Sequence, residues 1–214
     1  MLFRSKVYGS LDSMNVGIAN NIPVHINGNV ATKIFGVNGD TVITNDLTIS
    51  GNGPTFDLYE HTITVGNNFT FDGLFNNNST NGYFKCQANS SSAISVGGTL
   101  TVQNLSGTNG LALIKHCIIA ADAIILQNLN NTGGVAVSLE SGDLNVMHDI
   151  TCSNNSGSYG AISFDNNSSV VTSKGNIDIS QNSCNGNYVT LFLNSTLTAT
   201  LGNVSINKIG RAHV

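Results

Sequence analysis

The sequence predicts an all-β fold, a right-handed parallel β-helix with three short strands in each coil. A unit of about 24–28 residues recurs along the chain, and each copy alternates short apolar stretches with turn residues. The 214 residues include 32 asparagines and 23 glycines, and both residue types tolerate the left-handed backbone of a tight turn. No stretch sustains the apolar spacing of an α-helix.

Each unit is too short to bury its own apolar face. Units stacked about 4.8 Å apart would form ladders of like residues and share one continuous core. About six or seven such coils fit the repeat region. A sandwich of antiparallel hairpins is the alternative all-β fold, but it gives no reason for a fixed internal period.

The repeat region is expected to cover residues 32–207, after an N-terminal segment at 1–31 that forms the first irregular coils. The expected units are Thr32–Thr55, Phe56–Gly82, Tyr83–Gly110, Leu111–Gly134, Val135–Gly160 and Ala161–Tyr188, followed by a partial unit. In the last complete unit, turn residues separate three expected strands at 161–164, 169–173 and 176–180.

The third strand of each unit repeats most regularly, as in GGTLTVQN, ADAIILQN, HDITCSNN and GNIDISQN. Residues spaced by two face the same way on a strand, so one apolar pair per coil is expected to point inward and to stack on the next. These pairs are Leu100/Val102, Ile124/Leu126, Ile150/Cys152 and Ile177/Ile179. In the final unit, Val189, Leu191 and Leu193 are expected inward with Phe192 outside, although a shift of one residue would exchange the faces.

The low charge of the chain excludes one class of partner. Charged residues make up 9% of the sequence, the net charge is −4, and the only arginines are Arg4 and Arg211. Nucleic-acid binding needs clustered Lys and Arg, so no nucleic-acid partner is expected. No apolar run approaches the roughly 18 residues of a membrane-spanning helix, and no signal peptide is visible at the start of the sequence.

Four cysteines, Cys86, Cys117, Cys152 and Cys184, lie about 30 residues apart without a Cys-x-x-Cys pair. That spacing is not a zinc signature, and we expect all four to be free, buried or half-buried, and without metal. Cys152 and Cys184 fall in different columns of the repeat, which does not favour the Cα separation of about 4.4–6.8 Å that a disulfide needs. A disulfide becomes an option if the protein is exported.

Short motifs of Asn and Gly recur between residues 70 and 190. The residues are Phe75, Asn78 and Gly82 in FNNNSTNGYF; Gly133 and Gly134 in LQNLNNTGGVAV; Cys152, Asn155, Gly160, Ala161 and Ile162 in CSNNSGSYGAI; and Ile179, Asn182 and Gly186 in ISQNSCNGNY. They resemble the repeats of the polymorphic outer membrane proteins, a family of autotransporter adhesins, in which Phe-x-x-Asn precedes Gly-Gly-Ala-Ile/Leu/Val. No unit here carries both halves intact.

The resemblance implies a secreted passenger displayed at the outer membrane, which adheres to a host-cell or glycan surface. In that family a C-terminal translocator would carry the membrane barrel, and no such segment lies within this chain. We expect the full-length protein to be monomeric and to need no cofactor.

Two rival functions stay open, a polysaccharide lyase or hydrolase and a structural spacer. Enzymes that act on acidic sugars use Arg or Lys to stabilise charge, and the lysines Lys85, Lys115 and Lys174 are scattered one to a coil. A hydrolase of neutral glycans needs two carboxylates about 5–10 Å apart across a cleft. A carboxylate pair converging on one exposed face would therefore favour an enzyme.

The densest titratable clusters are interpreted as ordinary strand and turn residues. The first cluster is Asp57, Glu60 and His61, and the second is Asp143, His148 and Asp149. His116 is interpreted as a partly buried strand residue and not as a metal ligand. No catalytic residue and no metal site are predicted.

The two ends of the sequence suggest a fragment. The final letters IGRAHV resemble the translation of a sequencing-adaptor read, so residues 208–214 are interpreted as a non-native tail on an environmental gene fragment. No cap is recognisable after Asn207, and the nearby segments VTLFLN and TLTATL contain no charge and no proline. Such strands suit edge-to-edge pairing, and the 214-residue chain is expected to associate on its own.

Overall fold

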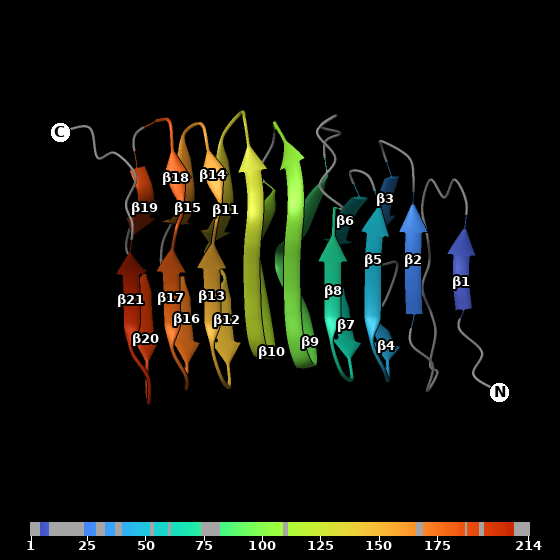
Figure 1. Cartoon of the computed structure of the whole chain (residues 1–214). Helices are drawn as coiled ribbons and strands as arrows, with labels where there is room; N and C mark the ends of the chain where they lie inside the picture. Colours follow the sequence, from blue (N-terminus) through green and yellow to red (C-terminus); the bar gives the residue numbers. More distant parts are fainter. Residues whose placement is uncertain are drawn as a thin grey trace.

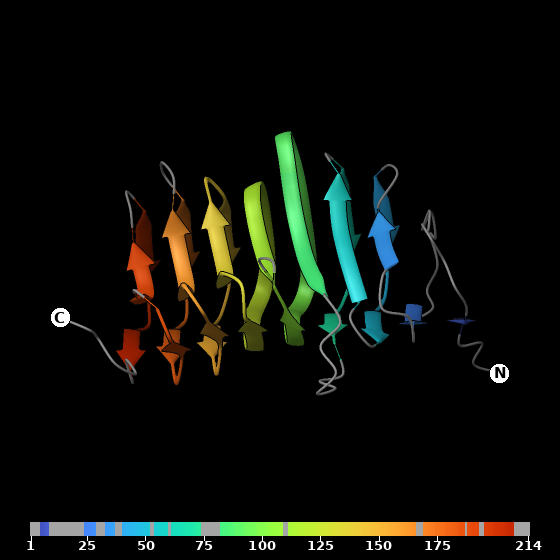
Figure 2. The same ribbon diagram turned by 90° about the horizontal axis from the view of Figure 1, so that it is seen from above.

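The computed structural model describes residues 5–8, 24–28, 33–36, 40–51, 54–59, 61–73, 82–108, 111–165, 169–186, 188–192 and 195–207. Every secondary-structure element in these ranges is a β-strand, and the strands pair in parallel. Figures 1 and 2 show the strands following one another along the long axis, with the chain ends at opposite ends of the molecule. The predicted parallel β-helix is confirmed.

The third strands of the coils form a continuous column along the molecule (Figure 1). Its members are β1 (Ser5–Tyr8), β2 (Val24–Gly28), β5 (Leu47–Gly51), β8 (Phe69–Asp72), the last parts of β9 (Tyr83–Gly107) and β10 (Ala112–Asn131), β13 (Ile150–Ser153), β17 (Ile177–Ser180) and β21 (Val204–Asn207). From β5 to β21 the chain visits this third column once per coil, in keeping with the expected six or seven coils. The strands β1 and β2 extend the column toward the N-terminus.

Two further columns complete each coil. The first column contains β3 (Lys33–Gly36), β6 (Pro54–Tyr59), the start of β9 and of β10, β11 (Val135–Glu140), β15 (Gly160–Asp165) and β19 (Tyr188–Phe192). The second contains β4 (Thr41–Ile43), β7 (Thr62–Val65), the middle of β9 and of β10, β12 (Asp143–Val146), β16 (Val170–Ser173) and β20 (Thr196–Ala199). Two short strands, β14 (Ser156–Gly157) and β18 (Ser183–Cys184), follow the third column and pair with each other. In the unit that begins at residue 161, the three expected strands match β15, β16 and β17 to within one residue at each end.

The predicted inward pairs stack as neighbours in the third column. Leu100 and Val102 pair in register with Ile124 and Leu126, which pair in turn with the next coil. Ile150 and Cys152 then pair with Ile177 and Ile179. All eight side chains are buried in one core, so the expected ladder and its register are confirmed.

Aromatic residues fill the core where β6, β8 and β9 meet. Phe56 stacks on Phe84 with ring centroids 5.0 Å apart, and Phe69 and Phe71 approach the same two rings edge-on or tilted. All four rings are fully buried. Such offset and edge-to-face contacts add about 0.5–1.5 kcal/mol per pair to the burial of apolar area.

In the first strand of the last coil, Val189 is the only one of the three residues expected to point inward whose side chain the structure describes. The register pairs Phe192 with Phe164 and Thr190 with Ile162, and these two partners belong to the buried core. Val189 is buried as expected. The expected facing of Leu191, Phe192 and Leu193 stays a prediction, because a shift of one residue would exchange the faces. The side chains of residues 191 and 192 and all of residues 193 and 194 lie outside what the structure describes.

A left-handed residue turns the chain at the end of the third strand in four successive coils. Asn104, Asn128, Asn154 and Gln181 occupy the same place in successive coils, and all four have φ between 55° and 57°. Asparagine is the residue that adopts this conformation most readily after glycine. Part of the abundance of Asn in the sequence is thus explained by the left-handed backbone at the corner that follows the third strand.

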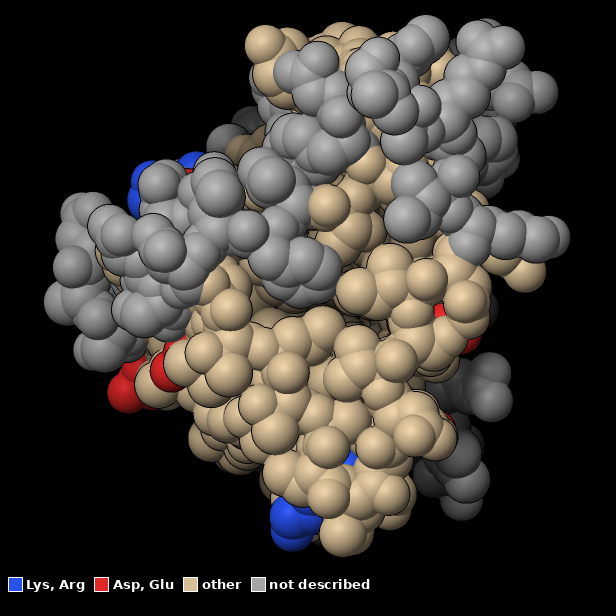
Figure 3. Space-filling view, turned by 90° about the vertical axis from the view of Figure 1, so that its left-hand side faces the viewer, with Lys and Arg blue, Asp and Glu red and all other residues tan. Residues whose placement is uncertain are grey.

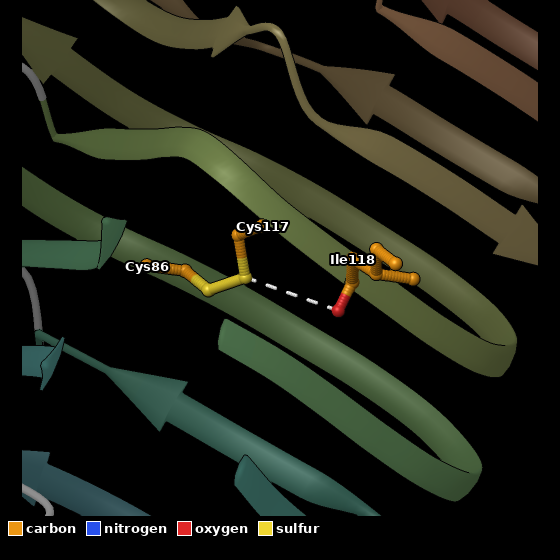
Figure 4. Close-up of a disulfide and its surroundings, with 3 residues drawn as sticks. All are labelled: Cys86, Cys117 and Ile118. Carbon is orange, nitrogen blue, oxygen red and sulfur yellow. Dashed lines mark hydrogen bonds between the residues drawn. A yellow bond between two sulfur atoms is a disulfide. The ribbon is translucent and has the colours of Figure 1, made fainter. Parts of the chain in front are cut away.

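The prediction that all four cysteines are free is wrong for two of them. Cys86 in β9 and Cys117 in β10 form a disulfide with their Cα atoms 6.1 Å apart (Figure 4). The register alone would place Cys86 beside Ile114, but His116 adopts φ 50° and the ladder shifts between Lys115 and Cys117. This irregularity returns Cys117 to bonding distance, and the spacing in the sequence does not reveal it.

Figure 4 also shows Cys117 Sγ 3.8 Å from the carbonyl oxygen of Ile118. A disulfide sulfur carries no proton to donate, so this approach is a packing contact. Both cysteines of the bridge are buried.

The remaining two cysteines are free, as predicted, with Cys152 buried and Cys184 half-buried. Burial, and to a smaller extent the nearby carboxylate of Asp178, raise the pKa of the Cys152 thiol to about 12. A thiol with this pKa stays protonated and unreactive at neutral pH.

Candidate binding surface

The asparagines of the repeat motif are buried and hold neighbouring coils together. The Asn155 amide accepts a hydrogen bond from the backbone N–H of Leu129 (3.1 Å) and donates one to the Leu126 carbonyl (3.0 Å). Asn182 repeats this arrangement one coil later, since it accepts from the N–H of Asn155 (2.9 Å) and donates to the Cys152 carbonyl (2.9 Å). Both side chains are buried, so these motif residues are structural and not part of an exposed site.

The buried asparagines replace leucine at a definite point of the solenoid. Leu105 and Leu129 occupy the same column in β9 and β10, where the two strands pair directly through the corner. The ladder between β10 and the next coil stops at Ser153 and resumes only at Ser156. Asn155 bridges that gap, because its amide group supplies the hydrogen bonds that the backbone no longer makes.

The other motif residues also have structural positions. Gly160, Ala161 and Ile162 begin β15 and are buried, as are Cys152, Ile179 and Gly82. Gly133 and Gly134 form the turn after β10, and a Cβ on Gly133 would lie only 2.1 Å from the Thr108 carbonyl oxygen. Gly186 follows β18 in a similar close approach to Ser158. Phe75 and Asn78 lie outside the described residues.

The titratable clusters singled out in the sequence are dispersed or engaged in turns. Glu60 lies outside the described residues, as does the side chain of Asp57, and His61 is half-buried beside β7. His148 Nδ1 lies 2.7 Å from Asp122 Oδ1 on the surface. His116 is exposed at the corner before the disulfide, which corrects the expected partly buried strand position.

Asp149 belongs to a ladder of turn caps before the third column. Its Oδ1 accepts the backbone N–H of Asn176 (2.6 Å), and Asn176 Oδ1 accepts the N–H of Asn203 (3.1 Å). Asp46 and Asn68 make the same contact at the other end of the molecule, at 3.0 Å. Asp143 Oδ1 accepts the N–H of Val170 at 3.3 Å. Within the described residues no three His, Cys, Asp or Glu side chains gather to hold a metal ion.

The surface that the sequence did not single out is the outer side of the third column, here called the polar face. From β8 to β21 its side chains are partly exposed, and all but one are polar. In order they are Thr70, Asp72, Thr101, Gln103, Ile125, Gln127, Thr151, Ser153, Asp178, Ser180, Ser205 and Asn207. The same period-2 pattern that buries one face of these strands exposes this one.

Side-chain amides link consecutive coils across the polar face. Gln127 donates to Gln103 (2.8 Å), and Gln103 donates to Asp72 (2.8 Å). A parallel ladder at the corner runs from Asn128 to Asn104 (3.1 Å) and from Asn104 to Asp72 (2.9 Å). Because each amide is held by its neighbours, the surface presents donors and acceptors at fixed positions and at low entropic cost.

Two open grooves lie along the polar face. One, of about 780 Å³, crosses β13, β17 and β21 and is lined by Thr151, Asp178 and Ser205 together with the turn caps Asp149, Asn176 and Asn203. The other, of about 440 Å³, lies at the corner and is lined by Asn104, Asn128, Asn130, Asn154 and Ser156. Amide and hydroxyl groups therefore dominate both grooves.

The charges in these grooves are two carboxylates. Asp149 and Asp178 line the larger groove, and Thr151, two residues after Asp149, pairs with Asp178, so the two acids lie diagonally in neighbouring coils. Asp178 Oδ2 accepts a hydrogen bond from the Ser180 hydroxyl (3.1 Å). Among the described residues, no lysine or arginine lines either groove, so an anionic ligand meets no described cation there.

Comparison with known proteins gives no relative: no family model, no curated protein and no solved structure matches this chain. Across the described ranges, no helix has the length and apolar character needed to cross a membrane.

Proposed function

We propose that this chain is a binding module of a secreted, surface-displayed β-helical protein, and that the polar face binds neutral glycans of a cell surface. The observation that carries this proposal is the run of mainly amide and hydroxyl side chains across consecutive coils, interrupted by Ile125 and two aspartates. A β-helix repeats every 4.8 Å or so along its axis, so equivalent polar groups recur at regular intervals under the two grooves. An extended glycan offers hydroxyl groups at similarly regular intervals.

The chemistry of the face favours neutral sugars. Amides and hydroxyls donate and accept hydrogen bonds without the desolvation cost of a charge. Acidic sugars would meet Asp149 and Asp178 without a compensating cation. Such a face discriminates its ligand by hydrogen-bond geometry, since unpaired buried polar groups penalise a mismatched sugar.

The disulfide supports export. Bridges such as Cys86–Cys117 persist in oxidising compartments and are rare in the reducing cytosol. Secretion and adhesion are also what the resemblance to the polymorphic outer membrane proteins implies, so two independent observations favour a surface protein.

A glycan array tests the proposed function. The wild-type chain is expected to bind neutral glycans and to ignore uronate-rich ones. Thr151→Glu places a carboxylate in the larger groove and is expected to abolish binding. Thr172→Glu is the matched control, because Thr172 is also a half-buried strand threonine but lies on the second column. Absence of any glycan binding by the wild type would favour a structural spacer.

A polysaccharide hydrolase is the second candidate, and Asp149 and Asp178 are the observation that favours it, because both acids line one exposed groove. Release of reducing ends from a bound glycan, lost in both Asp149→Asn and Asp178→Asn, would identify an enzyme. Binding without release in all three proteins supports the non-catalytic function.

A further inference from the structure

The last described coil has one free edge. β19, β20 and β21 each pair with the preceding coil, and no other described strand pairs with them. The carbonyls of Asn203, just before β21, and of Asn207, its last residue, accept hydrogen bonds from the backbone N–H groups of Ile177 and Gln181 in the preceding coil. Backbone groups alternate in direction along a strand, so the amides and carbonyls of Val204 and Ile206 face the free edge.

The inward column of the core is also uncovered at this coil. Ile177 and Ile179 are 1% and 2% exposed, whereas Val204 and Ile206, which continue their two columns, are 44% and 39% exposed. Leu201 in the preceding turn is 85% exposed. The described end of the solenoid therefore presents an apolar core section together with unpaired backbone groups.

This end carries none of the features that usually protect a sheet edge. Natural edges use charged side chains, proline or bulges to prevent pairing with another chain. From Tyr188 to Asn207 the sequence contains no charged residue and no proline. Figure 3 looks at this end of the molecule, and its described surface is mostly uncharged, with the charged atoms at the periphery.

We propose that the free edge of β21 binds the β1 edge of a second copy, so that copies stack head to tail along one axis. β1 begins the third column, pairs in parallel with β2 and with no other described strand, and has four residues, as β21 does. A copy stacked in the same register would place Ser5–Tyr8 against Val204–Asn207 in the way that β21 stacks on β17.

The charges of the two strands also favour a second copy of the chain as the partner of β21. In that register Lys6 falls in the column that contains Ser205 and Asp178, so the incoming strand brings a lysine to the column that holds the one carboxylate of the final two third-column strands. Because the two contacting surfaces differ, the contact is heterologous, and copies stacked along one axis do not close into a symmetric dimer or a ring. Association is therefore expected to proceed beyond a dimer.

Multi-angle light scattering after size exclusion tests this contact, with Ile206→Lys to charge the β21 edge and Lys6→Glu to reverse the charge in β1. The wild-type mass is expected to grow with concentration beyond that of a dimer. Each variant alone is expected to remain at or near the monomer mass of 22.3 kDa. Mixed in equal amounts, the two variants are expected to form a dimer, since each supplies the edge that the other lacks.

Ile118→Lys is the matched control, because Ile118 is also an exposed strand isoleucine but lies in β10, which is paired on both sides, with β9 and with β12. This variant is expected to associate as the wild type does. Circular dichroism shows whether the edge variants keep the wild-type β content. A wild type that stays monomeric at tens of micromolar, a closed dimer, or folded edge variants that associate as fully as the Ile118 control would each overturn the proposal.

Discussion

Replacing Asn155 by leucine separates two explanations of the buried asparagine ladder. Leucine occupies the same column at Leu105 and Leu129, so a site that needs only apolar filling would accept Asn155→Leu without loss. If the amide is required, the variant leaves the N–H of Leu129 and the carbonyl of Leu126 without their partners.

The expected loss follows from these two groups. Each buried backbone group left without a hydrogen bond costs about 1–3 kcal/mol, and burying the leucine side chain in place of the amide returns about 2 kcal/mol. The net destabilisation is therefore about 2 kcal/mol, which corresponds to a fall in Tm of about 4–8 °C for a chain of this size.

Thermal and urea unfolding followed by circular dichroism measure this loss. Asn145→Leu is the matched control, because Asn145 is exposed on β12, and surface changes of this kind stay within about 0.5 kcal/mol. An Asn155→Leu variant as stable as the wild type, or more stable, would refute the bridging role of the amide.

Four further predictions concern the core and the cysteines. Ile177→Asp buries an unpaired carboxylate between stacked coils, so it is expected to destabilise the fold by more than about 4 kcal/mol in urea titrations. An unchanged midpoint of urea unfolding would contradict the register. The double variant Cys86→Ser/Cys117→Ser opens a loop of 31 residues and is expected to lose about 3–4 kcal/mol in the same titration; no loss would show that the bridge does not constrain the unfolded chain. In native alkylation at pH 8 read by mass spectrometry, Cys184 is expected to react before Cys152, and equal rates would contradict the burial of Cys152. The pKa of the Cys152 thiol rises from 9.0 to about 12 on folding, so between these pH values the unfolded state loses the proton that the native state keeps. The free energy of unfolding should therefore fall by about 1.4 kcal/mol per pH unit above pH 9. A Cys152→Ala variant should lack this contribution, and identical alkaline slopes in the two proteins would contradict it.

The repeat made the fold predictable, while local irregularities did not show in the sequence. Alternation with a period of two and a unit of constant length identified the coil and placed Ile150 and Ile177 in one inward column. The disulfide was not predicted from the sequence, because it depends on the left-handed backbone of His116 and on the register shift after Lys115. A one-dimensional spacing contains no information on such a corner.

The candidate surface was predicted only in outline. The motif asparagines were identified by their spacing, but Asn155 and Asn182 turned out to be buried. Spacing records that a residue recurs in each coil and does not record the side to which it points. The polar face consists of ordinary Thr, Ser, Gln and Asn residues, and only the stacking of coils brings Thr151 and Asp178 together in one groove.

Nuclear Overhauser contacts between coils test the stacked parallel register most directly. The Ile206→Lys variant is suited to this measurement, because it is expected to remain monomeric at the required concentration. In parallel pairing, amide–Hα contacts should link Ile150 to Ile177, and Cys152 to Ile179, without close Hα–Hα contacts between the strands. Strong Hα–Hα contacts between neighbouring strands would show antiparallel hairpins and contradict the β-helix, the polar face and the functions built on it.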